Sequence, residues 1–121
     1  MNLSSLAALL FALAAAAQAG DSFPPSSVAA TARELAAHLS GKSFGATYAN
    51  GTKIKTRFEA NGNLAASAPG FSDTGRWKAE EGKLCGSLQK GGEFCNEARF
   101  DAGVLYLRRM NGEVIRYEPE Q

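Results

Sequence analysis

From Lys42 to the C-terminus, hydrophobic and polar residues alternate with a period of two. Ile54, Thr56 and Phe58 alternate with charged residues, which is typical of a strand with one buried and one solvated face. Turn pairs such as Asn-Gly, Pro-Gly and Gly-Gly separate the alternating runs and indicate hairpins. The runs cover residues 44–48, 54–58, 64–68, 74–79, 83–88, 93–100, 104–109 and 113–118.

The sequence therefore predicts a mainly β fold, with seven to eight antiparallel strands in a meander. Closing the meander into a small barrel or a sandwich removes or shortens the exposed sheet edges, which are prone to aggregation. Trp77 lies in an alternating run between turn glycines, and we expect it to be buried.

Before these strands the period changes to that of a helix over residues 28–39. Ser26 or Ser27 is placed to cap its N-terminus, and Gly41 stands where a left-handed residue ends a helix. We expect the helix to lie across the sheet or to plug one end of it. Its apolar stripe consists of Val28, Ala32, Leu35 and Leu39.

The N-terminal residues have the features of a secretory signal peptide. Residues 6–17 are apolar and uncharged, and Ala17-Gln18-Ala19 fits the small-x-small cleavage rule. The run is shorter than the roughly 20 residues that span a bilayer. We predict a signal peptide over residues 1–19, a flexible lead-in over 20–26 and a single β-rich domain with its N-terminal helix over 27–121.

The charge balance of the chain limits the classes of partner that we expect. Thirteen Lys and Arg against twelve Asp and Glu give a net charge of +1, without the basic surplus of a nucleic-acid-binding protein. We expect a small molecule or a periplasmic protein as partner, no nucleic acid, and no transmembrane segment after cleavage. The predicted location is the periplasm or the extracellular medium.

Cys85 and Cys95 are the two cysteines of the chain. Export and an even count favour a disulfide. If the loop between them centres on Lys90, the two cysteines face each other across a hairpin, at a separation that a disulfide spans. Metal binding is the weaker interpretation, because the lone His38 is far away and a four-ligand zinc set is missing. Redox catalysis lacks a Cys-x-x-Cys motif.

Several short motifs are shared with one group of proteins. They are Glu34-Leu35, Ser40-Gly41-Lys42-Ser43, Phe58 with Asn61-Gly62, Gly75-Arg76-Trp77-Lys78, and Gly82-Lys83-Leu84-Cys85 before a second cysteine. The pattern resembles a family of small exported proteobacterial proteins of unknown function, over most of the mature chain. The resemblance implies a fold and a compartment, and it supplies no catalytic residues.

Catalytic chemistry has little support in the sequence. His38 is the only histidine, and Glu80-Glu81 stands in a turn beside Gly82. The sequence contains no nucleophile elbow, phosphate loop or metal motif. We therefore predict that the protein is not an enzyme and requires neither a cofactor nor a metal.

Aromatic and basic residues near the C-terminus suggest a ligand site. If Asn111-Gly112 forms a two-residue turn, Tyr106 faces Tyr117, and Arg108 shares their face. We hypothesise that these three residues and Tyr48 point into one interior or cleft and meet a polar group of a ligand. The alternative is a structural core that contains a tyrosine pair.

Two functions are compatible with these features. The first is a non-catalytic periplasmic binding or envelope-maintenance protein, whose specificity the sequence does not define. The alternative is a proteinaceous inhibitor of a cell-wall hydrolase, with residues 68–74 as the loop that would enter the enzyme cleft. A carrier requires an apolar interior with an opening, whereas an inhibitor requires a rigid exposed loop.

Overall fold

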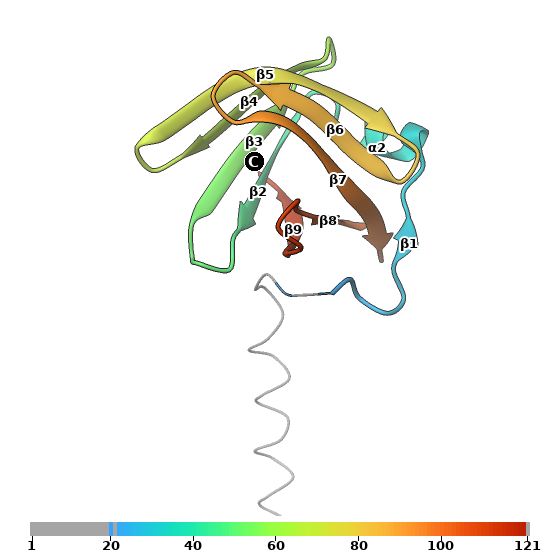
Figure 1. Cartoon of the computed structure of the whole chain (residues 1–121). Coiled ribbons are helices and arrows are strands. Elements are labelled where there is room, and N and C mark those ends of the chain that lie inside the picture. Colours follow the sequence, from blue (N-terminus) through green and yellow to red (C-terminus); the bar gives the residue numbers. More distant parts are fainter. Residues whose placement is uncertain (1–19, 21, 121) are drawn as a thin grey trace, which may run out of the picture.

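The computed structural model describes Gly20 and residues 22–120, so the predicted signal peptide lies outside the described residues. Within them the chain forms nine strands and one short helix. Eight strands close into an antiparallel barrel, and the ninth pairs with the barrel from outside. Figure 1 shows the barrel with its strands crossing in front of one another and the helix at one end. The mainly β prediction is confirmed, and the barrel is the form that it takes.

All eight predicted strands are present, each pairing antiparallel with the next along the chain. The last strand returns to the first through Phe44 opposite Pro119 and Gly45 opposite Glu118, and this pairing closes the barrel. The strands are β2 (Lys42–Thr47), β3 (Lys53–Phe58), β4 (Asn63–Ala68), β5 (Phe71–Glu80), β6 (Lys83–Leu88), β7 (Gly92–Asp101), β8 (Val104–Arg108) and β9 (Val114–Pro119).

Two glycines stand where the backbones and side chains of β5, β6 and β7 approach closely. A Cβ atom added at Gly75 would overlap the backbone carbonyl of Ser87, and one at Gly86 would meet the ring of Phe94. Both glycines occupy strand positions whose side chains would point into the barrel. Their missing side chains permit the close backbone approach that a small barrel requires.

The helix α2 (Ala32–Leu39) begins later than predicted. Thr31 is its N-cap, accepting a hydrogen bond from the Glu34 backbone N–H while the Glu34 carboxylate accepts one from the Thr31 backbone N–H. This reciprocal capping box fixes the first turn. Val28–Ala29 is instead the short strand β1, which pairs with β7. The prediction that the helix begins at Val28 is therefore wrong.

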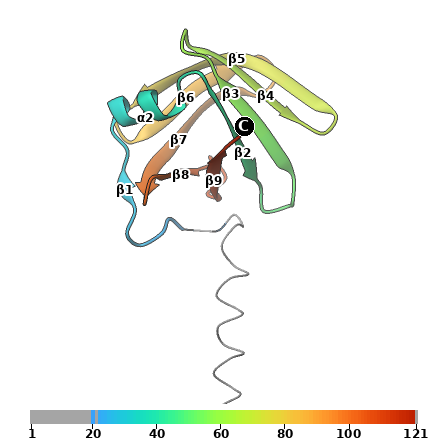
Figure 2. The same ribbon diagram turned by 180° about the vertical axis from the view of Figure 1, so that it is seen from behind.

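Helix α2 closes one end of the barrel (Figure 2). Leu35 and Leu39 are fully buried, and the ring of His38 packs 5.2 Å from that of Phe44 and 5.0 Å from that of Phe100. The described part of the chain has no helix with the length and apolar character needed to cross a membrane. The buried core consists of Ala30, Leu35, Leu39, Phe44, Ala46, Phe58, Leu64, Leu84, Ala98, Leu105, Leu107 and Ile115.

The segment predicted as a flexible lead-in is anchored to the outside of the barrel. The ring of Phe23 contacts two guanidinium groups: its centroid lies 4.9 Å from that of Arg99 and 5.0 Å from that of Arg108. The hydroxyl of Ser26 donates a 2.6 Å hydrogen bond to Asp101. These contacts hold the segment against β7 and β8.

Candidate functional site

A cavity of about 250 Å³ lies inside the barrel, at the end away from helix α2. The β2–β3, β6–β7 and β8–β9 turns surround its mouth, and side chains of the five strands β3, β4, β6, β7 and β9 form its walls. Most of the lining is apolar or aromatic, as in sites for small organic molecules. The lining residues are Tyr48, Ile54, Thr56, Phe58, Leu64, Ala66, Leu84, Leu88, Gly91, Gly92, Glu93, Phe94, Asn96, Arg109, Met110, Ile115 and Tyr117.

One wall of the cavity carries a pair of hydroxyl groups. Thr56 on β3 is buried, and its side chain is hydrogen-bonded to that of Tyr117 on β9, two strands away around the barrel. Burial raises the pKa of Tyr117 to about 12, although the Thr56 hydrogen bond and the charge of Arg109 oppose the rise. Tyr117 therefore remains a neutral hydroxyl at every pH near neutrality.

An arginine is held rigidly at the mouth. Arg109 Nη1 donates a 2.7 Å hydrogen bond to Glu113, and both side chains are largely shielded from solvent. The Arg109 guanidinium stacks on the ring of Tyr48, 3.6 Å from its centroid. The other carboxylate oxygen of Glu113 accepts a 2.5 Å hydrogen bond from the Ala49 backbone N–H. The guanidinium charge is thus neutralised before any ligand arrives.

Asn96 faces the cavity from the opposite wall. It lies on β7, four strands around the barrel from Thr56 on β3, at a half-buried position opposite Leu84. Within the part of the chain that the structure describes, its side-chain amide makes no hydrogen bond. An amide offers two donors and an acceptor oxygen, so this group is available to bind water or a ligand.

The structure brings together two of the four predicted site residues. Tyr48 and Tyr117 line the cavity, whereas Tyr106 and Arg108 point to the outside of the barrel. The register pairs Tyr106 with Arg116 and Arg108 with Val114. The predicted pairing of Tyr106 with Tyr117 is therefore wrong by one residue.

The β8–β9 turn accounts for this difference. Gly112 N–H bonds to the Arg109 carbonyl, and Arg109 N–H bonds to the Glu113 carbonyl. The loop thus contains three residues rather than two, with Gly112 in the left-handed region at φ 93°. Such a loop is the next commonest hairpin connection after the two-residue one. A one-residue shift exchanges the inner and outer faces of a strand, so Arg109 takes the place predicted for Arg108.

Outside the barrel, Arg108 has an ordinary surface environment. Its guanidinium lies 3.5 Å from Glu97 at the nearest atoms and contacts the ring of Phe23. Tyr106 lies between Arg99 and Arg116 on neighbouring strands. These residues help to hold the N-terminal segment rather than forming part of the cavity.

Sequence reasoning missed three cavity residues: Thr56, Asn96 and Arg109. Thr56 and Asn96 are polar residues at positions that alternate with the charged, outward-facing ones, and this parity is a signal that the sequence contains. Arg109 had no comparable signal, because its direction depends on the length of the loop that follows it.

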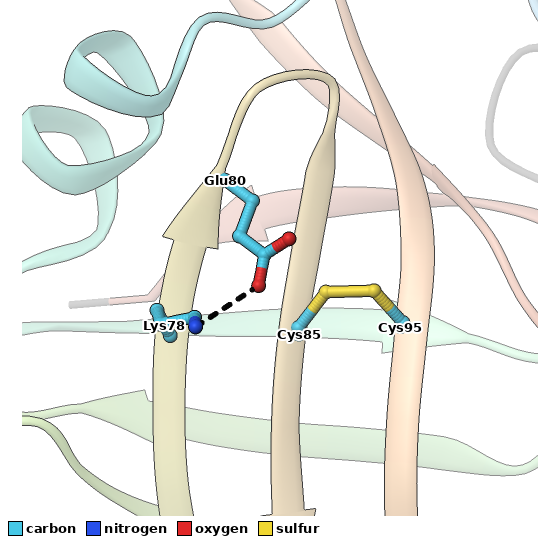
Figure 3. Close-up of a disulfide and its surroundings, with 4 residues drawn as sticks. All are labelled: Lys78, Glu80, Cys85 and Cys95. Atoms are coloured by element: carbon cyan, nitrogen blue, oxygen red, sulfur yellow. Dashed lines mark ion pairs between the residues drawn. A yellow bond between two sulfur atoms is a disulfide. The ribbon is translucent and has the colours of Figure 1, made fainter.

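The predicted disulfide is present between Cys85 and Cys95, which face each other across β6 and β7. Figure 3 shows it beside Glu80, whose carboxylate lies 3.2 Å from the Lys78 ammonium. A Glu80 oxygen lies within 4.8 Å of both sulfurs. Because the sulfurs are bonded to each other, they present no thiolate to a metal.

His38 has a structural environment at the helix end of the barrel. Burial lowers the pKa of His38, and the nearby positive charge of Lys42 lowers it further. Its Nε2 atom is buried and has no hydrogen-bond partner among the described residues. The neutral ring fills space between the helix and the barrel, at the end opposite to the mouth of the cavity.

Fold and site together define an eight-stranded antiparallel barrel with an internal cavity that opens at one end. No protein-family model, curated protein or solved structure matches this chain. The resemblance to a family of exported proteins therefore stays a prediction.

Proposed function

We propose that the protein is a non-catalytic binding protein of the periplasm or the extracellular medium, whose barrel holds a small ligand. The observation that supports this function is the cavity of about 250 Å³ with an apolar lining. It offers room for about eight water molecules at liquid density. Asn96 adds a polar group of the kind that orients a ligand in such sites.

The proposed location is supported by the disulfide between Cys85 and Cys95. Such bonds form and persist in oxidising compartments and are rare in the reducing cytosol. The apolar run and the small-x-small motif of residues 1–19 agree with export.

A pair of neighbouring alanines offers a direct test of binding. Ala66 on β4 lines the cavity, whereas Ala65 is exposed on the outer face of the same strand. Ala66→Phe places a ring in the cavity, and Ala65→Phe places the same ring in solvent. Both variants and the wild type would be purified from periplasm and compared by native mass spectrometry.

We expect a retained small molecule in the wild type and in Ala65→Phe, and its loss in Ala66→Phe. Circular dichroism and thermal melting establish that each variant folds. If Ala66→Phe does not fold, Ala66→Leu fills the cavity with a smaller side chain. Equal ligand content in the Ala65 and Ala66 variants, or no ligand in any of the proteins, would contradict the proposal.

The alternative function, inhibition of a cell-wall hydrolase, is favoured by one exposed hairpin. Phe71, the first residue of β5 after the β4–β5 turn, is 48% exposed. The Lys90 ammonium lies 5.5 Å from the Phe71 ring centroid and donates a 2.8 Å hydrogen bond to the Ser72 carbonyl. This bracing gives the hairpin the rigidity that an inhibitory loop needs. Phe71→Ala should then abolish inhibition of a peptidoglycan hydrolase without affecting ligand retention.

A further inference from the structure

The walls of the cavity are suited to a flat molecule. Phe58, Phe94, Tyr48 and Tyr117 all contribute rings to its lining. Aromatic rings pack against one another in offset or edge-to-face arrangements, and the Phe58 ring already contacts that of Trp77 edge-on, at 5.4 Å between centroids. The cavity volume matches a ligand about the size of one or two fused rings.

The charges around the cavity disfavour an ionic ligand. Among its described lining residues, Arg109 and Glu93 carry charge. Arg109 is already paired with Glu113 at 2.7 Å, so a buried anion would have to displace that carboxylate. Glu93 is exposed at the rim, where it repels an anion and remains too well solvated to attract a cation strongly.

Asp73 adds no free charge to the interior. Although its position on β5 faces inward, opposite Ala66, its carboxylate accepts hydrogen bonds from the backbone N–H groups of Thr74, Lys90 and Gly91. These bonds hold the β6–β7 turn and occupy the carboxylate. An ion buried without a partner is strongly unfavourable, so the ligand that fits this interior is uncharged.

The polar groups of the cavity differ in whether they can form a hydrogen bond to a ligand. The hydroxyls of Thr56 and Tyr117 are hydrogen-bonded to each other. Asn96 faces them from across the barrel, and its amide makes no hydrogen bond to any other described residue. An amide offers both donors and an acceptor oxygen, so it pairs with an N–H or a hydroxyl on the ligand.

From these observations we infer the ligand class: a small, uncharged aromatic compound with one N–H or O–H group, which hydrogen-bonds to Asn96. This inference rests on the proposed binding function and extends it to the chemistry of the ligand. Asn96 is then the residue that distinguishes such a compound from an apolar one of the same shape.

Three probes of similar size test this assignment. Indole is uncharged and has one N–H, benzothiophene has the same ring sizes without an N–H, and an indole carboxylate adds a negative charge. Their affinities for the wild type, Asn96→Leu and Thr56→Val would be measured by calorimetric titration. Thr56→Val is the matched control, because it removes a cavity hydroxyl that already has a partner.

We expect the wild type to bind indole about fivefold more tightly than benzothiophene, the factor that one net hydrogen bond supplies, and more tightly than the carboxylate. Asn96→Leu should bring indole and benzothiophene to similar affinity, whereas Thr56→Val should keep most of the preference. Asn96→Leu should remain folded with a melting temperature close to that of the wild type, since the amide that it removes makes no hydrogen bond to another described residue. Asn96→Ala is a second variant if leucine does not fit.

The contrary outcomes separate the two proposals. Tighter binding of the carboxylate than of indole, or an unchanged indole preference in the Asn96 variants, would overturn the ligand class and leave the binding function intact. Failure of the wild type to bind any of the three probes would overturn this ligand class. If the wild type purified from periplasm also retains no ligand, the proposed function fails as well.

Discussion

Tyr117 shows how much the environment of one side chain depends on the barrel around it. Its ring lines the cavity and packs 6.0 Å from the ring of Phe44, while its hydroxyl is bonded to Thr56. Tyr106, on the next strand, lies on the outer face among arginines. Two tyrosines close together in the sequence therefore occupy an interior and a surface.

The raised pKa of Tyr117 predicts a specific loss of stability in alkali. Burial raises it to about 12, above the value of roughly 10 that an unfolded tyrosine has. Below pH ~10 both states keep the proton, and the free energy of unfolding is unaffected. Between about pH 10 and pH 12 the unfolded state loses its proton first, so stability falls.

Urea unfolding of the wild type and Tyr117→Phe at several pH values checks this prediction. The variant should lack the part of the alkaline decrease that Tyr117 causes, although it also loses the hydrogen bond to Thr56 at every pH. Parallel pH curves for the two proteins would show that Tyr117 does not titrate in this way.

At the scale of the strands and their turns, backbone contacts decide the shape of the barrel. In the hairpin from β5 to β6, Gly75 and Gly86 leave no room for a side chain. The hairpin from β6 to β7 is held by the disulfide on its outer face and by Asp73 at its turn. Local chemistry at a few positions thus supports the pairings between these neighbouring strands.

Gly75→Ala should be severely destabilising. The new Cβ would overlap the Ser87 carbonyl, and backbone in a closed barrel has little freedom to move. Gly45→Ala on β2 is the matched control, because there the new Cβ meets the flexible side chain of Glu120. We expect a loss of roughly 3 kcal/mol or more for Gly75→Ala, as for other overpacked interiors, and less than about 1 kcal/mol for Gly45→Ala. Chemical denaturation measures both, and similar losses would contradict the steric argument.

The lowered pKa of Asp73 predicts that its carboxylate stabilises the folded state and that this stabilisation is lost in acid. Burial alone would raise the pKa of Asp73, but the N–H groups of Lys90, Gly91 and Thr74 and the charge of Lys90 hold it below its usual value. The unfolded state therefore protonates first, and the stabilisation is present above about pH 4. It is lost as the pH falls through the lower pKa of the folded state.

Asp73→Asn removes the titrating group and leaves a neutral side chain of the same shape. Its stability should fall less steeply than that of the wild type as the pH is lowered from about 6 toward 3, a range that begins above the usual pKa of aspartate. Denaturation at matched ionic strength provides the comparison. An equally steep acid decrease in both proteins would mean that the β6–β7 turn does not depend on the carboxylate charge.

At the scale of the whole molecule, the two ends of the barrel differ. Helix α2 and its buried Leu35 and Leu39 close one end, so the interior is open where Arg109 and Met110 stand. The pairing of β2 with β9 closes the wall. The disulfide lies outside this closure and links neighbouring strands that are already paired.

Replacing Cys85 and Cys95 together with serine should lower the free energy of unfolding by about 3 kcal/mol. This is the loop-entropy estimate for a bond whose cysteines are separated by 10 positions. The barrel should still form, because the backbone pairing of β6 and β7 does not require the sulfurs. Urea denaturation of the variant and the oxidised wild type gives the difference, and equal stabilities would show that the bond leaves the unfolded chain unconstrained.

Alternation and turn residues were sufficient to predict much of this molecule from its sequence. The period of two located all eight barrel strands, because successive side chains of a strand point alternately into the barrel interior and into water. The hairpin around Lys90 was symmetric enough to predict that Cys85 faces Cys95. The helix start was misplaced, although Thr31 and Glu34 have the spacing of a capping box, because the alanine-rich pattern continued upstream.

Only the tertiary structure decided which polar groups share the cavity. The loop after β8 contains three residues, and this one extra residue sends Arg109 inward and Arg108 outward. Thr56 and Asn96 line the same cavity because the sheet closes on itself, which brings β3 and β7 to opposite walls. The sequence by itself determined the strands and the disulfide, since these depend on neighbours along the chain. The cavity depends on hairpin register, which the exact length of a loop decides, and on closure of β2 with β9, which are far apart in the sequence.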